Sequence, residues 1–227
     1  MTRAAFSPFK GIFFDLDGTL ADTAPDLVAA ANKLLLARNL NPMPYEVLRP
    51  RASAGARGLI SGAFGIDPDH PEFITLRDEF FANYEKALLV DSVIFDGVDH
   101  LLSQLDQAKL PWGIVTNKSE RFTNPLTNLM GLRQRAVSTV SGDTTPYSKP
   151  HPEPILHAAR IANIDPSKSV YIGDDIRDIV AGKAAGMQTI AAAYGYCGCD
   201  EPPEAWGADY LVRHPLELLE IIFPNRA

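Results

Sequence analysis

Short apolar runs alternate with segments of helical periodicity along most of this chain. The apolar runs have the length of strands and cover residues 10–15, 112–116, 136–140, 169–172, 188–192 and 210–212. Apolar residues recur at helical spacing over residues 98–108, 122–132, 152–162 and 176–185, and a last helix is expected to start near Pro215. Strands that are apolar throughout are typical of parallel sheets buried on both faces. The alternation therefore predicts an α/β fold with a doubly wound (Rossmann-like) parallel sheet.

One long segment interrupts this alternation. Between Leu20 and Val90 there is no strong strand signal, whereas helical spacing is evident from Leu27 to Leu35 and again over residues 72–89. A stretch rich in proline and small residues separates the two helical patterns. We therefore predict an all-helical cap domain at residues 21–93, inserted into a core domain that comprises residues 1–20 and 94–227.

Composition narrows the classes of function. The 227 residues carry a net charge of -7, which argues against a general binder of nucleic acid or of anionic membranes. No stretch has the apolar length of a transmembrane helix, and residues 1–9 lack the sections of a signal peptide. We expect a cytoplasmic protein that is a monomer or homodimer. Cys197 and Cys199 are too close for a comfortable disulfide, so we interpret them as reduced loop thiols.

Four predicted strand ends carry polar residues that a buried sheet does not need. In chain order these are Asp15-Leu16-Asp17-Gly18-Thr19, Thr116-Asn117-Lys118, Ser148-Lys149-Pro150, and Gly173-Asp174-Asp175 followed by Asp178. In a doubly wound sheet the carboxyl ends of the strands meet at one crevice. We therefore expect these four segments to form one site.

The expected site combines several carboxylates with one lysine. Carboxylates so close together are costly unless a cation lies among them, and a set of hard oxygen ligands favours Mg²⁺. Lys149 and the Thr116 hydroxyl would then bind a phosphoryl group, and Gly18 would let the backbone approach it. Asp15, at the strand end, is the natural nucleophile for an aspartyl-phosphate intermediate, and Asp17 could serve as the general acid and base.

These motifs, in this order, resemble those of the haloacid dehalogenase-like phosphatase superfamily. The resemblance covers nearly the whole chain. Within the superfamily, the chain is most similar to the phosphoglycolate phosphatase group. Four further stretches are also similar to N-acetylmuramic acid 6-phosphate phosphatases, namely residues 115–118, 149–152, 194–196 and 206–209.

The resemblance implies a role for each motif. Asp15 would be the nucleophile and a metal ligand, and Asp17 the acid and base, with its backbone carbonyl on the metal. Asp174 would be the third protein ligand. Thr116, Asn117, Lys149 and Gly18 are the expected phosphate-binding residues. Asp175 and Asp178 are either adjacent to the metal or structural.

Substrate choice is expected to reside in the cap, where Arg57 is a candidate for binding a substrate carboxylate. The predicted function is a Mg²⁺-dependent phosphatase similar to phosphoglycolate phosphatase, which acts on a small phosphorylated metabolite. N-acetylmuramic acid 6-phosphate is the alternative substrate, and a sugar phosphomutase on the same scaffold is the alternative reaction. A signalling receiver domain is disfavoured because its acidic pair precedes its phosphorylated aspartate.

Overall fold

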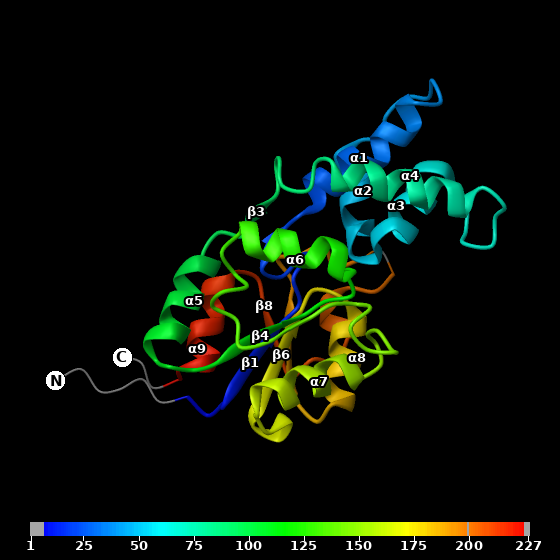
Figure 1. The fold of residues 1–227 in the computed structure, drawn as a ribbon. Coiled ribbons are helices and arrows are strands. Elements are labelled where there is room, and N and C mark those ends of the chain that lie inside the picture. The colour runs from blue at the N-terminus through cyan, green and yellow to red at the C-terminus, as the bar shows by residue number, and fades with distance from the viewer. Residues whose placement is uncertain (1–6, 199, 225–227) are drawn as a thin grey trace.

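A six-stranded parallel sheet forms the centre of the core (Figure 1). The structure, a computed structural model, describes residues 7–198 and 200–224. The strands lie in the order β5-β4-β1-β6-β7-β8, and every neighbouring pair is parallel. Their bounds are β1 (Gly11–Phe14), β4 (Trp112–Val115), β5 (Thr139–Val140), β6 (Ser169–Gly173), β7 (Gln188–Ala192) and β8 (Tyr210–Val212). The predicted fold class is confirmed.

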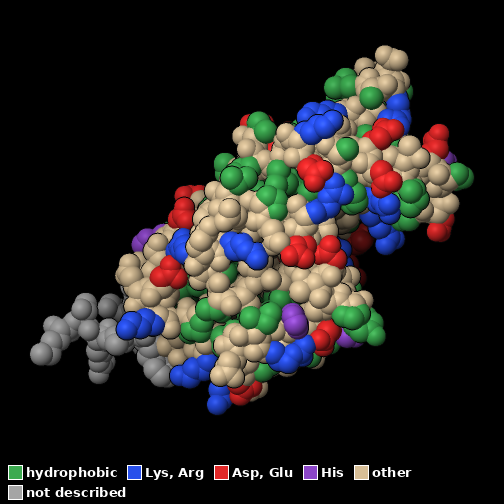
Figure 2. Space-filling view, in the orientation of Figure 1, with side chains coloured by type: hydrophobic (Ala, Val, Ile, Leu, Met, Phe, Trp, Pro, Cys, Tyr) green, Lys and Arg blue, Asp and Glu red, His purple; other side chains and the backbone are tan. Residues whose placement is uncertain are grey.

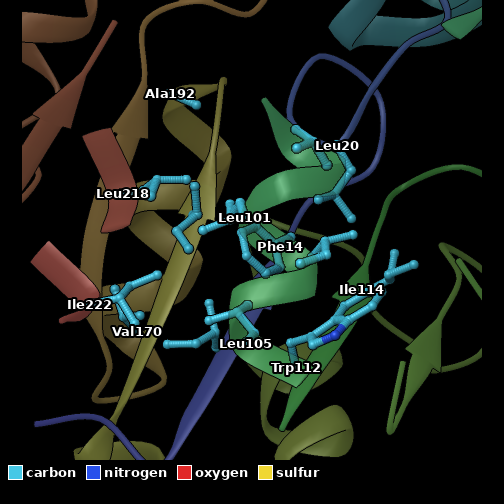
Figure 3. Close-up of a cluster of buried hydrophobic side chains, with 14 of the residues drawn as sticks. Phe14, Leu20, Leu101, Leu105, Trp112, Ile114, Val170, Ala192, Leu218 and Ile222 are labelled. Atoms are coloured by element: carbon cyan, nitrogen blue, oxygen red, sulfur yellow. The ribbon is translucent and has the colours of Figure 1, made fainter. Parts of the chain in front are cut away.

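Helices cover both faces of this sheet. On one face lie α5 (Val98–Gln107), η4 (Pro215–Glu217) and α9 (Leu218–Ile222), and on the other lie α7 (Glu153–Ala162) and α8 (Ile176–Ala184) (Figure 1). The short helix η2 (Pro166–Lys168) directly precedes β6. Strand β1 serves both layers because successive side chains point to opposite faces. Ile12 and Phe14 pack with α5 and α9, as Figure 3 shows for Phe14, whereas Phe13 packs with α7 and α8. This double burial explains why the strands read as continuous apolar runs.

The cap projects from the carboxyl edge of the sheet as a separate helical layer (Figure 1). It consists of α1 (Ala24–Leu36), α2 (Tyr45–Leu48), η1 (Arg49–Ala54), α3 (Gly55–Phe64) and α4 (Phe73–Glu85). Its buried residues form a hydrophobic cluster of their own, which two core residues, Phe122 of α6 (Glu120–Leu129) and Tyr196, complete. The cap therefore has its own hydrophobic core, which packs against the sheet domain at Phe122 and Tyr196.

Two short strands carry the chain into and out of the cap. β2 (Ala21–Asp22) and β3 (Val93–Ile94) pair antiparallel, so the two linkers lie side by side. The predicted boundaries at residues 20/21 and 93/94 fall at this ribbon, and the division into two domains at those residues stays a prediction. Strands of two residues carry no periodicity, which is why sequence patterns did not reveal them.

Asp26 in the first turn of α1 anchors the second linker. Its buried carboxylate accepts hydrogen bonds from the backbone N–H groups of Val90 (2.9 Å), Asp91 (3.1 Å) and Ser92 (2.9 Å), and from the Ser92 hydroxyl (2.6 Å). Burial alone would raise the pKa of Asp26, but the Ser92 hydroxyl and the three N–H groups outweigh it and lower that pKa. The cap helix and the linker are thus held together by one ionised side chain.

Helix α3 was not evident from the sequence. The glycines in α3 weaken its helical propensity, so the sequence indicated only a stretch of small residues there, but buried Leu59 and Ile60 hold the helix in place.

The molecular surface carries charges of both signs. On the face in Figure 2, basic and acidic side chains are interspersed over both core and cap. Among the described residues, no helix has the length and apolar character needed to cross a membrane. Cys197 is a free thiol. Cys199 lies outside the described residues, as do residues 1–6 of the segment in which no signal peptide was predicted.

Candidate active site

The four predicted segments converge at the carboxyl edge of the sheet. Asp15 directly follows β1, and its N–H still donates to the Ile172 carbonyl of β6 (2.9 Å), so the sheet ladder sets its position. Beyond it the chain turns back at once, because the N–H of Gly18 donates to the Ala21 carbonyl (2.9 Å). This tight turn exposes the Asp15 carboxylate at the switch point between β4 and β6, where ligands bind in such sheets.

Lys149 is the cationic centre of the site. Its ammonium lies 3.0 Å from the Asp15 carboxylate and 2.7 Å from that of Asp178, and it donates to the Val115 carbonyl and the Tyr171 hydroxyl, each at 2.9 Å. Burial lowers the pKa of Lys149, but the two carboxylates more than offset this effect and raise it. The ammonium is therefore a permanent charge in a site that is almost closed to solvent.

Asp15, Asp174 and Asp178 form a carboxylate cluster. One oxygen from each lies within 4.8 Å of the others. Asp174 is fully buried, and burial together with the charges of Asp15 and Asp178 raises its pKa well above the ordinary range. A group of oxygen donors with surplus negative charge fits Mg²⁺, which prefers hard oxygen ligands and keeps part of its water shell.

Asp175 and Asp178 also build the start of α8. The Asp175 carboxylate accepts from the N–H of Arg177 (2.9 Å), while Asp178 accepts from the N–H of Asp175 (3.1 Å), which completes a capping box. Asp178 thus joins the capping box, Lys149 and the carboxylate cluster. Its pKa is raised, chiefly by burial and against the opposing effect of Lys149.

The remaining predicted phosphate-binding residues have distinct surroundings. Asn117 accepts from the N–H of Lys149 and donates to its carbonyl, both at 2.9 Å, so its amide holds the lysine backbone in place. Thr116 is 2% exposed and lines the cavity described below. Gly18 has a φ of +80°, and a Cβ there would overlap the Asp174 carboxylate. Glycine at 18 therefore makes room for Asp174, and phosphate binding by these three residues stays a prediction.

The carboxylate of Asp17 points away from the cluster. Its Oδ1 lies 3.0 Å from the Lys118 ammonium and also accepts a hydrogen bond from the Thr23 hydroxyl. Burial lowers the pKa of Lys118, but Asp17 outweighs that effect and the pKa is raised. Asp17 would therefore approach a metal only through its backbone, whereas its side chain faces the substrate space.

A cavity of about 380 Å³ lies between core and cap. The core side contributes Asp15, Asp17, Thr116, Asn117, Lys118, Ser119, Phe122 and Arg177, and the cap side contributes Leu27, residues 52–57, Phe73, Arg77, Phe80, Phe81 and Tyr84. Arg57, the cap residue singled out from the sequence, is among them. The core side of the cavity is thus charged at Asp15 and Asp17, and the cap side is mainly apolar, with four aromatic residues among its twelve.

Sequence reasoning missed two cap–core contacts at this site. The Ser53 hydroxyl donates to the Asp174 carboxylate (3.2 Å), and Arg177 donates to the Ser53 carbonyl (2.8 Å) while it pairs with Asp175 (2.7 Å). These contacts join residues more than 120 positions apart, so no local pattern indicates them. Ser53 brings the cap into direct contact with the carboxylate cluster.

Residues 12–192 match the family model described as Haloacid dehalogenase-like hydrolase. The chain belongs to the haloacid dehalogenase-like hydrolases. The resemblance inferred from the motifs is therefore confirmed.

The relatives of this chain include phosphatases of two kinds. The chain is 40% identical to an N-acetylmuramic acid 6-phosphate phosphatase of Pseudomonas putida, over 94% of this chain and 96% of the relative. It is 42% identical to a phosphoglycolate phosphatase of Xanthomonas campestris, over 93% of this chain and 95% of the relative. The predicted enzyme class, a phosphoric monoester hydrolase, is confirmed.

Solved structures show the same architecture. A predicted phosphoglycolate phosphatase from Haemophilus somnus superposes with a TM-score of 0.84 at 26% identity, over 95% of this chain and 99% of that one. A haloacid dehalogenase-like hydrolase from Bacteroides fragilis superposes with a TM-score of 0.81 at 20% identity, over 92% and 99%. The fold thus accommodates sequences that differ at four positions in five.

Proposed function

We propose that this protein hydrolyses a phosphorylated, carboxylated amino sugar, with N-acetylmuramic acid 6-phosphate as the best candidate, through a phosphoryl group carried on Asp15. In the first step a carboxylate oxygen of Asp15 attacks phosphorus as the bond from phosphorus to the sugar oxygen breaks. The electron pair of that bond goes to the sugar oxygen, which takes a proton from Asp17. The products are the free sugar and an aspartyl phosphate.

The second step returns the enzyme to its starting state. Asp17, now a carboxylate, takes a proton from water as the water oxygen attacks phosphorus, and the bond from phosphorus to Asp15 breaks. Inorganic phosphate leaves and Asp15 is an anion again. The Lys149 ammonium, 3.0 Å from Asp15, stabilises the negative charge of the phosphoryl oxygens in both steps.

The proposal includes Mg²⁺ held by Asp15, Asp174 and the backbone carbonyl of Asp17. When bound, the ion would reduce the repulsion between the Asp15 carboxylate and the phosphate dianion. Asp178 is close enough to join the cluster, but Lys149 and the N–H of Asp175 already occupy its two oxygens. We therefore assign Asp178 to the support of Lys149.

The cavity carries the choice of substrate. Ligand pockets for molecules of drug size span roughly 300 to 1,000 Å³, and this cavity of about 380 Å³ belongs to that range. Phosphoglycolate has two carbons and would leave most of the space to water. The four aromatic residues on the cap side offer apolar surface for a sugar ring, and Arg57 and Arg77 on the same side are suited to a carboxylate.

Phosphoglycolate remains the second candidate substrate. Several relatives are named phosphoglycolate phosphatase, and the same arginines could bind the carboxylate of phosphoglycolate. A phosphomutase is the third, since phosphoryl return to a bound sugar would use the same residues. A cytoplasmic location and a monomer or homodimer are part of the proposal, and cell fractionation and sedimentation would test them.

The test is phosphate release from N-acetylmuramic acid 6-phosphate, phosphoglycolate, other sugar phosphates and p-nitrophenyl phosphate, with and without Mg²⁺. We expect the highest kcat/KM for the muramic acid derivative and no activity in Asp15→Asn. A higher kcat/KM for phosphoglycolate would select the second candidate. A sugar phosphate that isomerises without release of phosphate would select the mutase.

A further inference from the structure

Each aspartate of the first loop has its own buried lysine. Lys149 pairs with Asp15 at 3.0 Å, and Lys118 pairs with Asp17 at 3.0 Å. The two ammonium groups come from loops after different strands. The proposed reaction uses Lys149 but gives no role to Lys118, whose side chain is only 7% exposed.

Lys118 is held from two sides. Its carbonyl accepts from the N–H of Gly142 (2.8 Å) and the hydroxyl of Thr123 (3.0 Å), so the root of its side chain is fixed in the core. Its ammonium lies 4.8 Å from the centre of the Tyr84 ring, which belongs to the cap helix α4. An ammonium over an aromatic face is stabilised by a cation–π interaction, which is strongest where water is excluded.

The Asp17 carboxylate is held by one of its two oxygens. Both the Lys118 ammonium and the Thr23 hydroxyl contact Oδ1. Fixing one oxygen of a carboxylate fixes the direction of the other. Asp17 lines the cavity, and we take Oδ2, the oxygen that Lys118 and Thr23 leave free, as the one that reaches a leaving group.

We propose that Lys118 is a positioning residue for Asp17, and that Tyr84 of the cap holds Lys118 in this role. The inference rests on the proposed role of Asp17 as general acid and base. It connects the cap with the reaction through two contacts: Tyr84 of the cap packs against the Lys118 ammonium, and that ammonium contacts the Asp17 carboxylate. A cap displaced from the core would remove the Tyr84 ring and loosen Asp17.

The chemistry of the leaving group makes this inference testable. An alkyl oxygen needs a proton as its bond to phosphorus breaks, because an alkoxide is a strong base. A p-nitrophenolate is a weak base and leaves without that proton. A defect in the placement of Asp17 therefore slows alkyl phosphates far more than p-nitrophenyl phosphate, and a general loss of structure slows both alike.

The experiment compares Lys118→Met with wild type on p-nitrophenyl phosphate and on the best alkyl phosphate of the panel. We expect kcat for the alkyl substrate to fall by roughly 10²-fold, within the range for general acid catalysis, and kcat for the aryl substrate to fall by less than about 10-fold. Lys86→Met, an exposed lysine at the end of α4, is the matched control. Circular dichroism verifies that each variant is folded.

Two further variants sharpen the result. Asp17→Asn alone sets the full leaving-group effect, and adding Lys118→Met to it is expected to change the rate on either substrate by less than about 3-fold, because residues acting through one another are not additive. Tyr84→Leu is expected to show the selective loss of Lys118→Met in weaker form, whereas Tyr84→Phe keeps the ring beneath the ammonium.

Several outcomes would overturn the inference. Equal losses on both substrates in Lys118→Met would mean a structural role, and a raised KM with unchanged kcat would mean that Lys118 binds substrate. An additive loss in the double variant, or Tyr84→Leu behaving like Tyr84→Phe, would break the link through Asp17 or through the cap. A wild-type protein inactive on every substrate would overturn the proposed function itself.

Discussion

The core side and the cap side of the cavity differ in how far their charged residues are paired. On the core side, each charged residue that lines the cavity has a partner of opposite charge close by: Asp15 with Lys149, Asp17 with Lys118, and Arg177 with Asp175. On the cap side, the lining is mainly apolar and includes four aromatic residues, and Arg57 is exposed, with no ion pair among the residues that the structure describes. The charged residues on the core side are paired with one another, whereas the cap side offers a ligand apolar surface and the unpaired Arg57.

This difference has a physical origin. A buried charge is tolerated only when a partner of opposite sign and hydrogen bonds compensate for its lost hydration, so the core residues depend on one another. Aromatic packing and an exposed arginine carry no such constraint. The core can therefore be expected to determine the reaction and the cap to determine the substrate, and the following changes test that separation.

The largest effect is expected from the core lysine. Lys149→Met would leave Asp15 and Asp178 close together without their cation, which we expect to abolish activity and to lower the free energy of unfolding by roughly 3 to 5 kcal/mol. Urea unfolding measures this change, with the exposed Lys168→Met as control. A variant as stable as wild type would show that the network is not as tightly coupled as its distances indicate.

The metal site comes next. Asp174→Asn removes one proposed ligand, and we expect a loss of about 100-fold or more in activity or in affinity for Mg²⁺, above the usual effect of residues that only support a metal ligand. Activity measured across a Mg²⁺ titration would show it. Thermal shift gives an independent readout, because Mg²⁺ should raise the Tm of wild type more than that of the variant. An unchanged Mg²⁺ requirement would remove Asp174 from the metal site.

A smaller and more selective effect is expected in the cap. Arg57→Met would remove a positive charge from the substrate end of the cavity, and we expect KM for the carboxylated substrate to rise by about 10-fold, as for one lost charged hydrogen bond. The kcat/KM for p-nitrophenyl phosphate, which has no carboxylate, should stay within about 2-fold of wild type. Arg160→Met on the core surface is the matched control. Equal losses on both substrates would contradict a separate role for the cap.

The smallest effect concerns the linker between the two regions. Asp26→Asn keeps an acceptor but loses the charge, and we expect a loss of about 1 kcal/mol of stability at pH 7. The folded protein lowers the pKa of Asp26, so its stabilisation is present above the ordinary pKa of 3.8 and is lost as the pH falls through the lower folded value. Melts from pH 7 to pH 3 should show the difference shrinking, with the exposed Asp69→Asn as control. A difference independent of pH would exclude the charge as its cause.

Most of the core was predictable because its signals are local. A strand buried on both faces must be apolar throughout, so residues 11–14, 112–115, 169–173 and 188–192 stood out. The polar residues just after these strands stood out for the same reason, and the sheet brings Asp15, Lys149 and Asp174 together as expected. The cap was predictable only as a helical block, and its glycine-rich α3 and the linker strands β2 and β3 were not.

The amino-acid sequence by itself determined the sheet, the acidic cluster with its lysine and the family, because each depends on consecutive residues at the end of a buried strand. Tertiary structure alone decided that Ser53 reaches Asp174, that Asp26 holds the second linker and that Tyr84 lies against Lys118. Those contacts join residues 34 to 121 positions apart. Their formation depends on how the cap packs against the core, and no local pattern of residues encodes that packing.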